Sequence, residues 1–125
     1  MSQMEKFDQF HDGYLDGLLI QGVTVHVFLS TADRREFVLE VPGVVSLKVD
    51  GFRQGNIIFD VLIRKGDDIT LHDIVKVFEF KDEARALRKL EEARRMNLIV
   101  LEINPSYGAS CIILAESVEL LPRLK

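Results

Sequence analysis

The stretch VTVHVFLS, residues 23–30, decides the fold class of this 125-residue chain. Its apolar side chains recur at every second position, as Val23, Val25, Val27 and Leu29. The positions between them carry Thr24, His26, Phe28 and Ser30. Side chains two residues apart lie on the same face of an extended strand, so this alternation predicts a β-strand with one buried face.

The same period of two runs through most of the first half of the chain. The further stretches that show it are YLDGLLIQ (14–21), REFVLEV (35–41), VVSLKVD (44–50) and NIIFDVLIR (56–64). The breaks between them are short and contain Gly22, Pro42-Gly43 and Gly51. A parallel crossover needs a dozen or more residues, so these breaks favour antiparallel neighbours. Residues 14–64 therefore predict a five-strand antiparallel meander.

The pattern changes after a polar loop at 64–68. TLHDIVKVFEF, residues 70–80, is rich in β-branched and aromatic residues and predicts a sixth strand. The next stretch has no β-branched residue and consists largely of good helix formers. Its apolar stripe is formed by Ala86, Leu87, Leu90 and Ala93. The sequence predicts a helix over about 82–97, with Asp82 as the N-cap and Asn97 at the C-terminal end.

Strand patterns return after this helix. LIVLEIN (98–104) and ASCIILAESVELL (109–121) predict two strands joined by a PSYG hairpin loop, with a bulge near 115–117. The fold class predicted is α+β and mainly antiparallel β. We expect about eight strands in a curled sheet, sandwich or partial barrel, with one helix packed at one side. A chain of this length is most simply a single domain, residues 1–125.

Composition limits the classes of partner. The formal net charge is −4, and residues 1–62 carry 5 basic and 9 acidic side chains, whereas residues 63–125 carry 11 of each. Nucleic-acid binding and attachment to anionic membranes both call for an excess of basic side chains. We therefore expect neither, and the acidic first half favours a basic protein partner.

Cysteine usage and hydropathy predict a cytoplasmic protein. The only cysteine is Cys111, so the chain forms no internal disulfide and needs no oxidising compartment. No apolar run reaches the about 18 residues of a membrane span, and the polar N-terminal stretch shows no secretory signal. No motif for a cofactor is present, so none is predicted.

An adjacent His and Asp occur twice, as His11-Asp12 and His72-Asp73. Such a pair marks the HD phosphohydrolase family, where it lies in an all-helical bundle, and here the first pair precedes Gly13 and a strand. The resemblance ends at the dipeptide. One interpretation joins both pairs in a metal site, which requires that they converge in space. The favoured interpretation is that His11-Asp12 shapes a turn before the first strand.

Other side chains suit binding rather than catalysis. The predicted binding residues are the two His-Asp pairs, Tyr14 and Tyr107. No catalytic residue or metal ligand is assigned. Phe7 and Phe10 are expected to pack as a lid over one end of the core. Cys111 lies within a strand pattern and is expected to be a buried apolar side chain rather than a nucleophile.

Three stretches resemble elements of small uncharacterised bacterial β-rich proteins. They are FHDG at 10–13, GNIIFD at 55–60 and NPSYGA at 104–109. Some proteins of that kind are grouped with polymorphic-toxin immunity proteins. The resemblance implies a stand-alone bacterial domain that works by binding.

These observations leave three functional hypotheses. The first is a non-enzymatic protein-interaction module, of the immunity or inhibitor kind. The second is a small metal-dependent enzyme that uses His11, Asp12, His72 and Asp73. The third is a structural homodimer that forms through an exposed strand edge.

Overall fold

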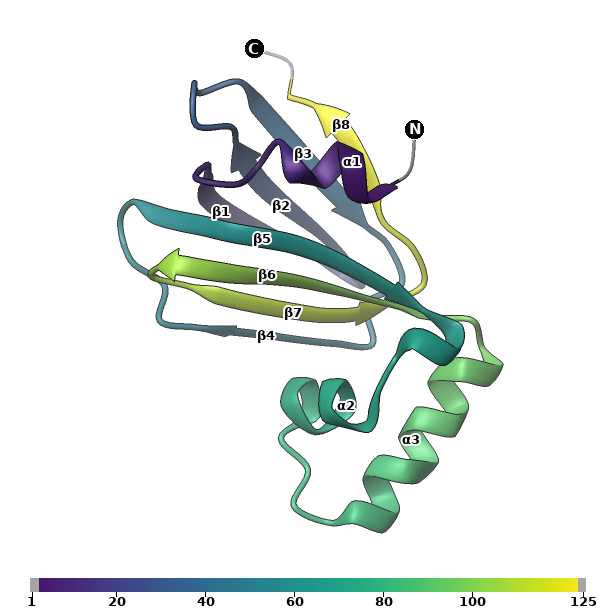
Figure 1. The fold of residues 1–125 in the computed structure, drawn as a ribbon. Helices are drawn as coiled ribbons and strands as arrows, with labels where there is room; N and C mark the ends of the chain where they lie inside the picture. Colours follow the sequence, from purple (N-terminus) through teal and green to yellow (C-terminus); the bar gives the residue numbers. More distant parts are fainter. Residues whose placement is uncertain (1–2, 124–125) are drawn as a thin grey trace.

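The computed structural model describes residues 3–123, with side chains from Lys6 onward. Its eight strands form one sheet in the order β4-β7-β6-β5-β1-β2-β3-β8 (Figure 1), and every neighbouring pair is antiparallel. The predicted α+β, mainly antiparallel class is confirmed, and the sheet is curled but not closed into a barrel. In the described part of the chain, no helix has both the length and the apolar character needed to cross a membrane.

The elements follow one another in the order α1, β1 to β5, a 3-10 turn, α2, α3 and β6 to β8. The strands are β1 (Tyr14–Gln21), β2 (Thr24–Ser30), β3 (Glu36–Val41), β4 (Ser46–Asp50), β5 (Asn56–Lys65), β6 (Ile99–Tyr107), β7 (Ser110–Ala115) and β8 (Glu119–Pro122). The helices are α1 (Gln3–Asp8), the 3-10 turn Gly66–Asp68, α2 (Leu71–Phe78) and α3 (Glu83–Arg95).

The predicted meander is right for three strands and wrong for the last two. β1, β2 and β3 pair in sequence order, but β4 crosses to the far edge of the sheet and pairs with β7. The Pro42-Gly43 stretch is not a tight hairpin turn: Val44 donates its backbone N–H to Val23 O, and Val45 donates to Leu114 O. Those bonds direct the chain away from β3, and β5 then returns beside β1.

Residues 70–80 contradict the prediction of a sixth strand, because Leu71–Phe78 is the helix α2. Thr70 caps it: its hydroxyl accepts from the Asp73 backbone, and the Asp73 carboxylate accepts from the Thr70 backbone. This reciprocal arrangement satisfies two backbone donors that otherwise lack partners. Ile74 and Val77, at helical spacing, are buried against the sheet. Tertiary packing and the cap outweigh the strand preference of the β-branched residues.

The predicted helix at 82–97 is confirmed as α3, with Asp82 accepting a bond from the Ala84 backbone at 2.9 Å and Asn97 in the left-handed conformation at φ 55°. The predicted strand at 109–121 divides instead into β7 and β8. Glu116 interrupts it, because its backbone N–H bonds to the carbonyls of Pro42 and Gly43. The number of strands is therefore as expected, while their identities differ.

The sheet is buried on both faces at its centre. One core lies between the two curled halves of the sheet and includes Val27, Leu39, Leu101 and Ile113, while α2 and α3 cover the other face of β6 and β7 (Figure 1). The expected lid is also present: α1 and the following turn bury Phe7 and Phe10 in the first core. The Phe10 ring meets Phe37 edge-to-face at 5.4 Å.

Candidate functional site

Turns from distant parts of the sequence gather at one end of the sheet, at the left in Figure 1: residues 11–13, 31–35, 51–55 and 108–109. β5 holds this end together. The Asp12 backbone N–H donates to the Ile58 carbonyl, and the Ile58 N–H donates to the Gly13 carbonyl. The side-chain amide of Asn56 accepts from the Ala109 backbone N–H. Gly13 is required here, because a Cβ would collide with the carbonyl oxygen of Ser30 and lie 2.9 Å from that of Phe10.

Several aromatic side chains lie at this end, and three of them are about half exposed. Tyr14 and Tyr107 pair with the same residue, Ile57, from opposite sides, so the three side chains form a row across β1, β5 and β6. Phe52, Phe59 and Tyr107 are 50%, 53% and 51% exposed. We call the surface formed by Tyr14, Arg34, Phe52, Phe59 and Tyr107 the aromatic end.

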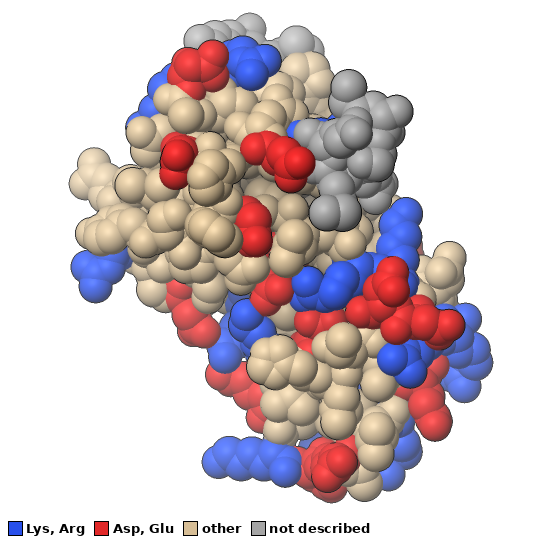
Figure 2. Space-filling model, in the orientation of Figure 1, with Lys and Arg blue, Asp and Glu red and all other residues tan. Residues whose placement is uncertain are grey.

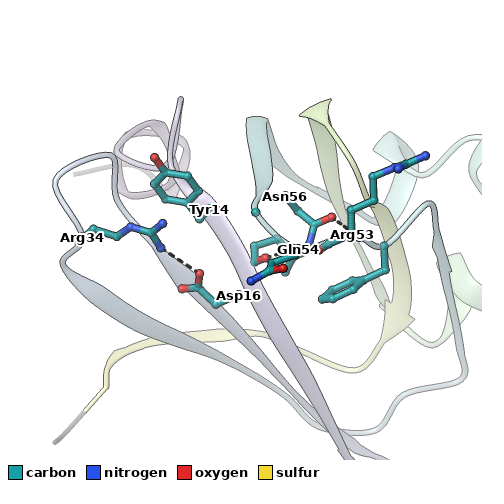
Figure 3. Close-up of a pocket in the computed structure, with 9 residues that line it drawn as sticks. Tyr14, Asp16, Arg34, Arg53, Gln54 and Asn56 are labelled. Carbon is teal, nitrogen blue, oxygen red and sulfur yellow. Dashed lines mark hydrogen bonds and ion pairs between the residues drawn. The ribbon is translucent and has the colours of Figure 1, made fainter.

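A groove of about 650 Å³ opens at the aromatic end, where β1 leaves β5 (Figure 3). The two strands pair only at Tyr14 and Leu15 of β1, and beyond this point they separate. The groove is lined by Tyr14, Leu15, Asp16, Arg34, Phe52, Arg53, Gln54, Gly55 and Asn56. Its lining combines aromatic and aliphatic surface with charged and amide groups, a composition suited to binding.

Arg34 is held over one wall of the groove. Its backbone adopts φ 66°, and its guanidinium carbon lies 3.6 Å from the centre of the Tyr14 ring. Asp16 accepts from the Arg34 guanidinium at 3.4 Å (Figure 3). Its other carboxylate oxygen lies 3.7 Å from the Arg123 guanidinium. Stacking and the ion pair together orient the guanidinium, while 61% of the Arg34 side chain stays exposed.

Asn56 fixes the opposite wall. Its buried side-chain amide accepts from the backbones of Arg53 (2.8 Å) and Ala109 (3.0 Å), and it donates to the carbonyl oxygens of Leu15 and Arg53. Gly108 packs so tightly on this amide that a Cβ there would collide with it. Within residues 3–123, no hydrogen bond or ion pair engages the guanidinium of Arg53, so it can meet a ligand.

A second recess, of about 360 Å³, lies along β5 on the other side of the 11–13 turn, and we call it the His11 hollow. It is lined by Phe7, Asp8, His11, Phe59, Asp60 and Val61. The Nδ1 atom of His11 is 2.7 Å from the Phe59 carbonyl oxygen, and Nε2 is 3.7 Å from the Asp12 carboxylate. Asp60 accepts from Asn104 at 2.8 Å. The hollow thus places exposed aromatic surface beside carboxylates.

The second His-Asp pair lies elsewhere. His11 contacts Phe59, whereas Asp73 bonds to Arg64, five residues further along β5, or about 17 Å at strand spacing. Asp73 caps α2, and His72 is exposed on that helix. Among the residues described, no group of three or more His, Cys, Asp or Glu side chains could hold a metal ion. The convergence that the metal hypothesis requires is therefore not found.

Asp73 instead belongs to a buried charge network that joins α2 to the sheet. Arg64 donates to Asp73 at 2.6 and 3.0 Å and to Glu102 at 2.8 Å, and Lys76 donates to Glu102 at 2.5 Å. Burial alone would raise the pKa of both carboxyls, but these hydrogen bonds and charges hold each pKa below its ordinary value. The network is a structural clamp between helix and sheet.

Of the predicted binding residues, His11, Asp12, Tyr14 and Tyr107 lie at or beside the aromatic end, and His72 and Asp73 do not. Sequence reasoning missed Arg34, Phe52 and Phe59, which come from turns and from a strand irregularity. A β-bulge between Ile58 and Asp60 turns Phe59 outward while Ile58 and Val61 stay buried. The available signal was the run of three consecutive apolar residues at 57–59, which leaves the buried face of the strand ambiguous.

Comparisons with known proteins identify no relative of this chain. No protein-family model, curated protein sequence or solved structure matches the chain. The function is therefore inferred from the geometry of the molecule.

Proposed function

We propose that this protein is a non-enzymatic interaction module that binds a protein partner through the aromatic end. One observation carries the proposal: three aromatic side chains near this end of the sheet are each about half exposed. Phe52 lines the groove, Phe59 lines the His11 hollow, and Tyr107 pairs with Ile57 of β5. Tyrosine, arginine and other large side chains supply most of the binding energy at protein interfaces. Arg34, already stacked on Tyr14, loses little further freedom when a partner covers it.

Charge around the aromatic end favours a basic partner. The groove, the His11 hollow and the 11–13 turn carry Asp8, Asp12, Asp16 and Asp60 against Arg34 and Arg53. Figure 2 shows acidic side chains scattered among neutral ones on the face that α1 and β5 present. A basic protein would be steered to this surface, and its affinity would fall as salt rises.

An immunity or inhibitor protein is the interaction class that we favour. The three stretches that carry the resemblance, 10–13, 55–60 and 104–109, meet at the aromatic end. They are joined by the backbone hydrogen bonds of Ile58 and by the side-chain amide of Asn56, which accepts from the Ala109 backbone. A protein of this class works by covering a surface of its target, which requires an exposed recognition patch and no chemistry of its own. We place the interaction in the cytoplasm, because the lone Cys111 needs no oxidising compartment.

The proposal is tested with a variant that removes the three exposed rings, Phe52→Ala/Phe59→Ala/Tyr107→Ala. The immobilised protein captures a partner from the cell of origin, and that partner is identified, purified and titrated by calorimetry. We expect one partner molecule per protein and an affinity at least about 100-fold weaker for the triple variant, since rings at interface centres contribute about 2 kcal/mol or more each.

The matched control is Leu87→Ala/Met96→Ala, which removes side chains that are 45% and 53% exposed at α3 and its C-terminal end. It should bind the partner as the unaltered protein does. Equal affinity of the triple variant and the control would refute the assignment of the binding surface. Circular dichroism of each variant establishes that the fold is retained.

A further inference from the structure

The separation of β1 from β5 leaves a strand edge open in the middle of the sheet. β1 pairs with β2 from Tyr14 opposite Ser30 to Gln21 opposite Thr24, with one irregularity between Leu15 and Gly17. On its other side it pairs with β5 only at Tyr14 and Leu15. Among the strands of the described residues 3–123, none pairs with the other edge of residues 17–21.

The hairpin turn fixes which backbone groups point to this open edge. Gly22, at φ 60°, is the first of two residues between the closing pair Gln21 and Thr24. The closing pair of a two-residue hairpin exchanges hydrogen bonds, and such pairs alternate along an antiparallel ladder. Gln21 and Leu19 thus bond to β2, whereas the N–H and C=O groups of Leu18 and Ile20 point outward.

The open edge has neither charge nor proline to protect it. Residues 17–24, GLLIQGVT, contain no ionisable side chain. Leu19, Ile20 and Val23 are 44%, 61% and 65% exposed. By contrast, the two outermost strands carry Lys48 and Asp50 in β4, and Glu119 and Pro122 in β8. Charges and proline are the usual means by which proteins block pairing between sheet edges.

We propose that a second copy of this chain pairs antiparallel with the open edge of β1, about a two-fold axis at Leu19. In this register Leu18 of each copy faces Ile20 of the other, and their outward backbone groups exchange four hydrogen bonds. Leu19 of one copy then lies opposite Leu19 of the other. This register is chosen because it brings the outward backbone N–H and C=O groups of Leu18 and Ile20 in one copy opposite those of the other copy.

A second copy fits this edge better than a charged peptide does. The axis brings no like charges together, because residues 17–24 carry none. It places the exposed Leu19 against Leu19 of the other copy and the exposed Ile20 against Leu18 of the other copy. Gly17 falls opposite Gln21, where the missing side chain leaves room for the larger one. The dimer uses a surface distinct from the aromatic end and does not depend on the proposed function.

The register is tested by disulfide trapping of Leu19→Cys. Residues opposite each other in a non-hydrogen-bonded pair have Cα atoms about 4.5 Å apart, within the range that a disulfide spans. The control is Gln21→Cys, which faces Gly17 in the proposed register. The natural Cys111 does not interfere, because it is buried and burial raises its pKa to about 12.

With oxidised glutathione as the oxidant, we expect Leu19→Cys to form a covalent dimer at least about five times faster than Gln21→Cys. Light scattering of the unaltered protein should show a mass that rises with concentration from 14.3 kDa towards twice that value. Ile20→Lys, at an exposed position, should fold and remain monomeric, since it places two like charges at the interface.

Two results would overturn the proposal. One is a monomeric mass for the unaltered protein at millimolar concentration. The other is a dimer whose formation is unaffected by Ile20→Lys, with equal trapping of Leu19→Cys and Gln21→Cys. The second result would assign self-association to another surface.

Discussion

Arg64 is the residue on which the buried charge in this protein depends. Its side chain is 22% exposed, and it pairs with Asp73 and Glu102, whose side chains are 5% and 11% exposed. Removing one partner from a buried ion pair leaves an uncompensated charge. This lowers the free energy of unfolding more than replacing the whole pair with apolar residues does. The network therefore holds α2 against β5 and β6 only while all its members are present.

We expect Arg64→Met to lower the free energy of unfolding by about 3 kcal/mol at pH 7, measured by urea titration. Asp73 and Glu102 have pKa values below their ordinary ones of 3.8 and 4.5 in the folded protein. Their stabilising contribution is complete above those ordinary values and is lost as the pH falls through the lowered ones. The difference in free energy of unfolding between Arg64→Met and the unaltered protein should therefore become smaller below about pH 4.

Arg88→Met, at an exposed position on α3, serves as the control and should change stability by no more than about 0.5 kcal/mol. A deficit for Arg64→Met that stays constant from pH 7 to pH 3 would show that lost packing, and not the charge network, causes the change.

Single residues of the site were only partly predictable from the sequence. His11 and Asp12 could be assigned to a turn, and the structure confirms this with Asp12 at φ 63° and its backbone N–H bonded to Ile58. Arg34 could not be singled out, because its stacking joins a residue of the 31–35 turn to Tyr14, the first residue of β1. Such contacts depend on tertiary structure, and no local pattern encodes them.

At the scale of elements, α2 shows how strand propensity misleads. Its β-branched residues suggested a strand, yet Leu71, Ile74 and Phe78 also recur at helical spacing, and Thr70 precedes Asp73 by the three residues of a cap. The spacing between Thr70 and Asp73 was the signal available in the sequence. The pairing of β4 with β7 left no such signal, because Leu47 and Ile113 are far apart in the sequence and no local pattern encodes their contact.

Thr70→Ala should lower the free energy of unfolding by about 1 kcal/mol, because α2 loses the side-chain acceptor at its N-terminus. Thr70→Ser keeps the hydroxyl and should remain close to the unaltered protein. Both values come from chemical denaturation followed by circular dichroism. Identical stabilities for the two variants would mean that the cap does not support α2.

At the scale of the whole molecule, the separation of β1 from β5 creates both proposed surfaces. At the point of separation the groove opens beside Tyr14 and Arg34, and beyond it the edge of residues 17–21 stays unpaired. The curled sheet keeps its core closed despite this separation, since α1 and the turn after it place Phe7 and Phe10 in the same core as both halves. The overall class followed from the alternation in the sequence, whereas the separation follows from non-local pairing.

Hydrogen exchange measured by mass spectrometry, with and without the captured partner, tests the central claim most directly. Binding through the aromatic end predicts slower exchange in residues 10–16, 51–59 and 104–109, which surround the exposed rings, and no change in α3. Slower exchange confined to α2 and α3, with residues 51–59 and 104–109 unaffected, would contradict the claim that the aromatic end is the recognition surface.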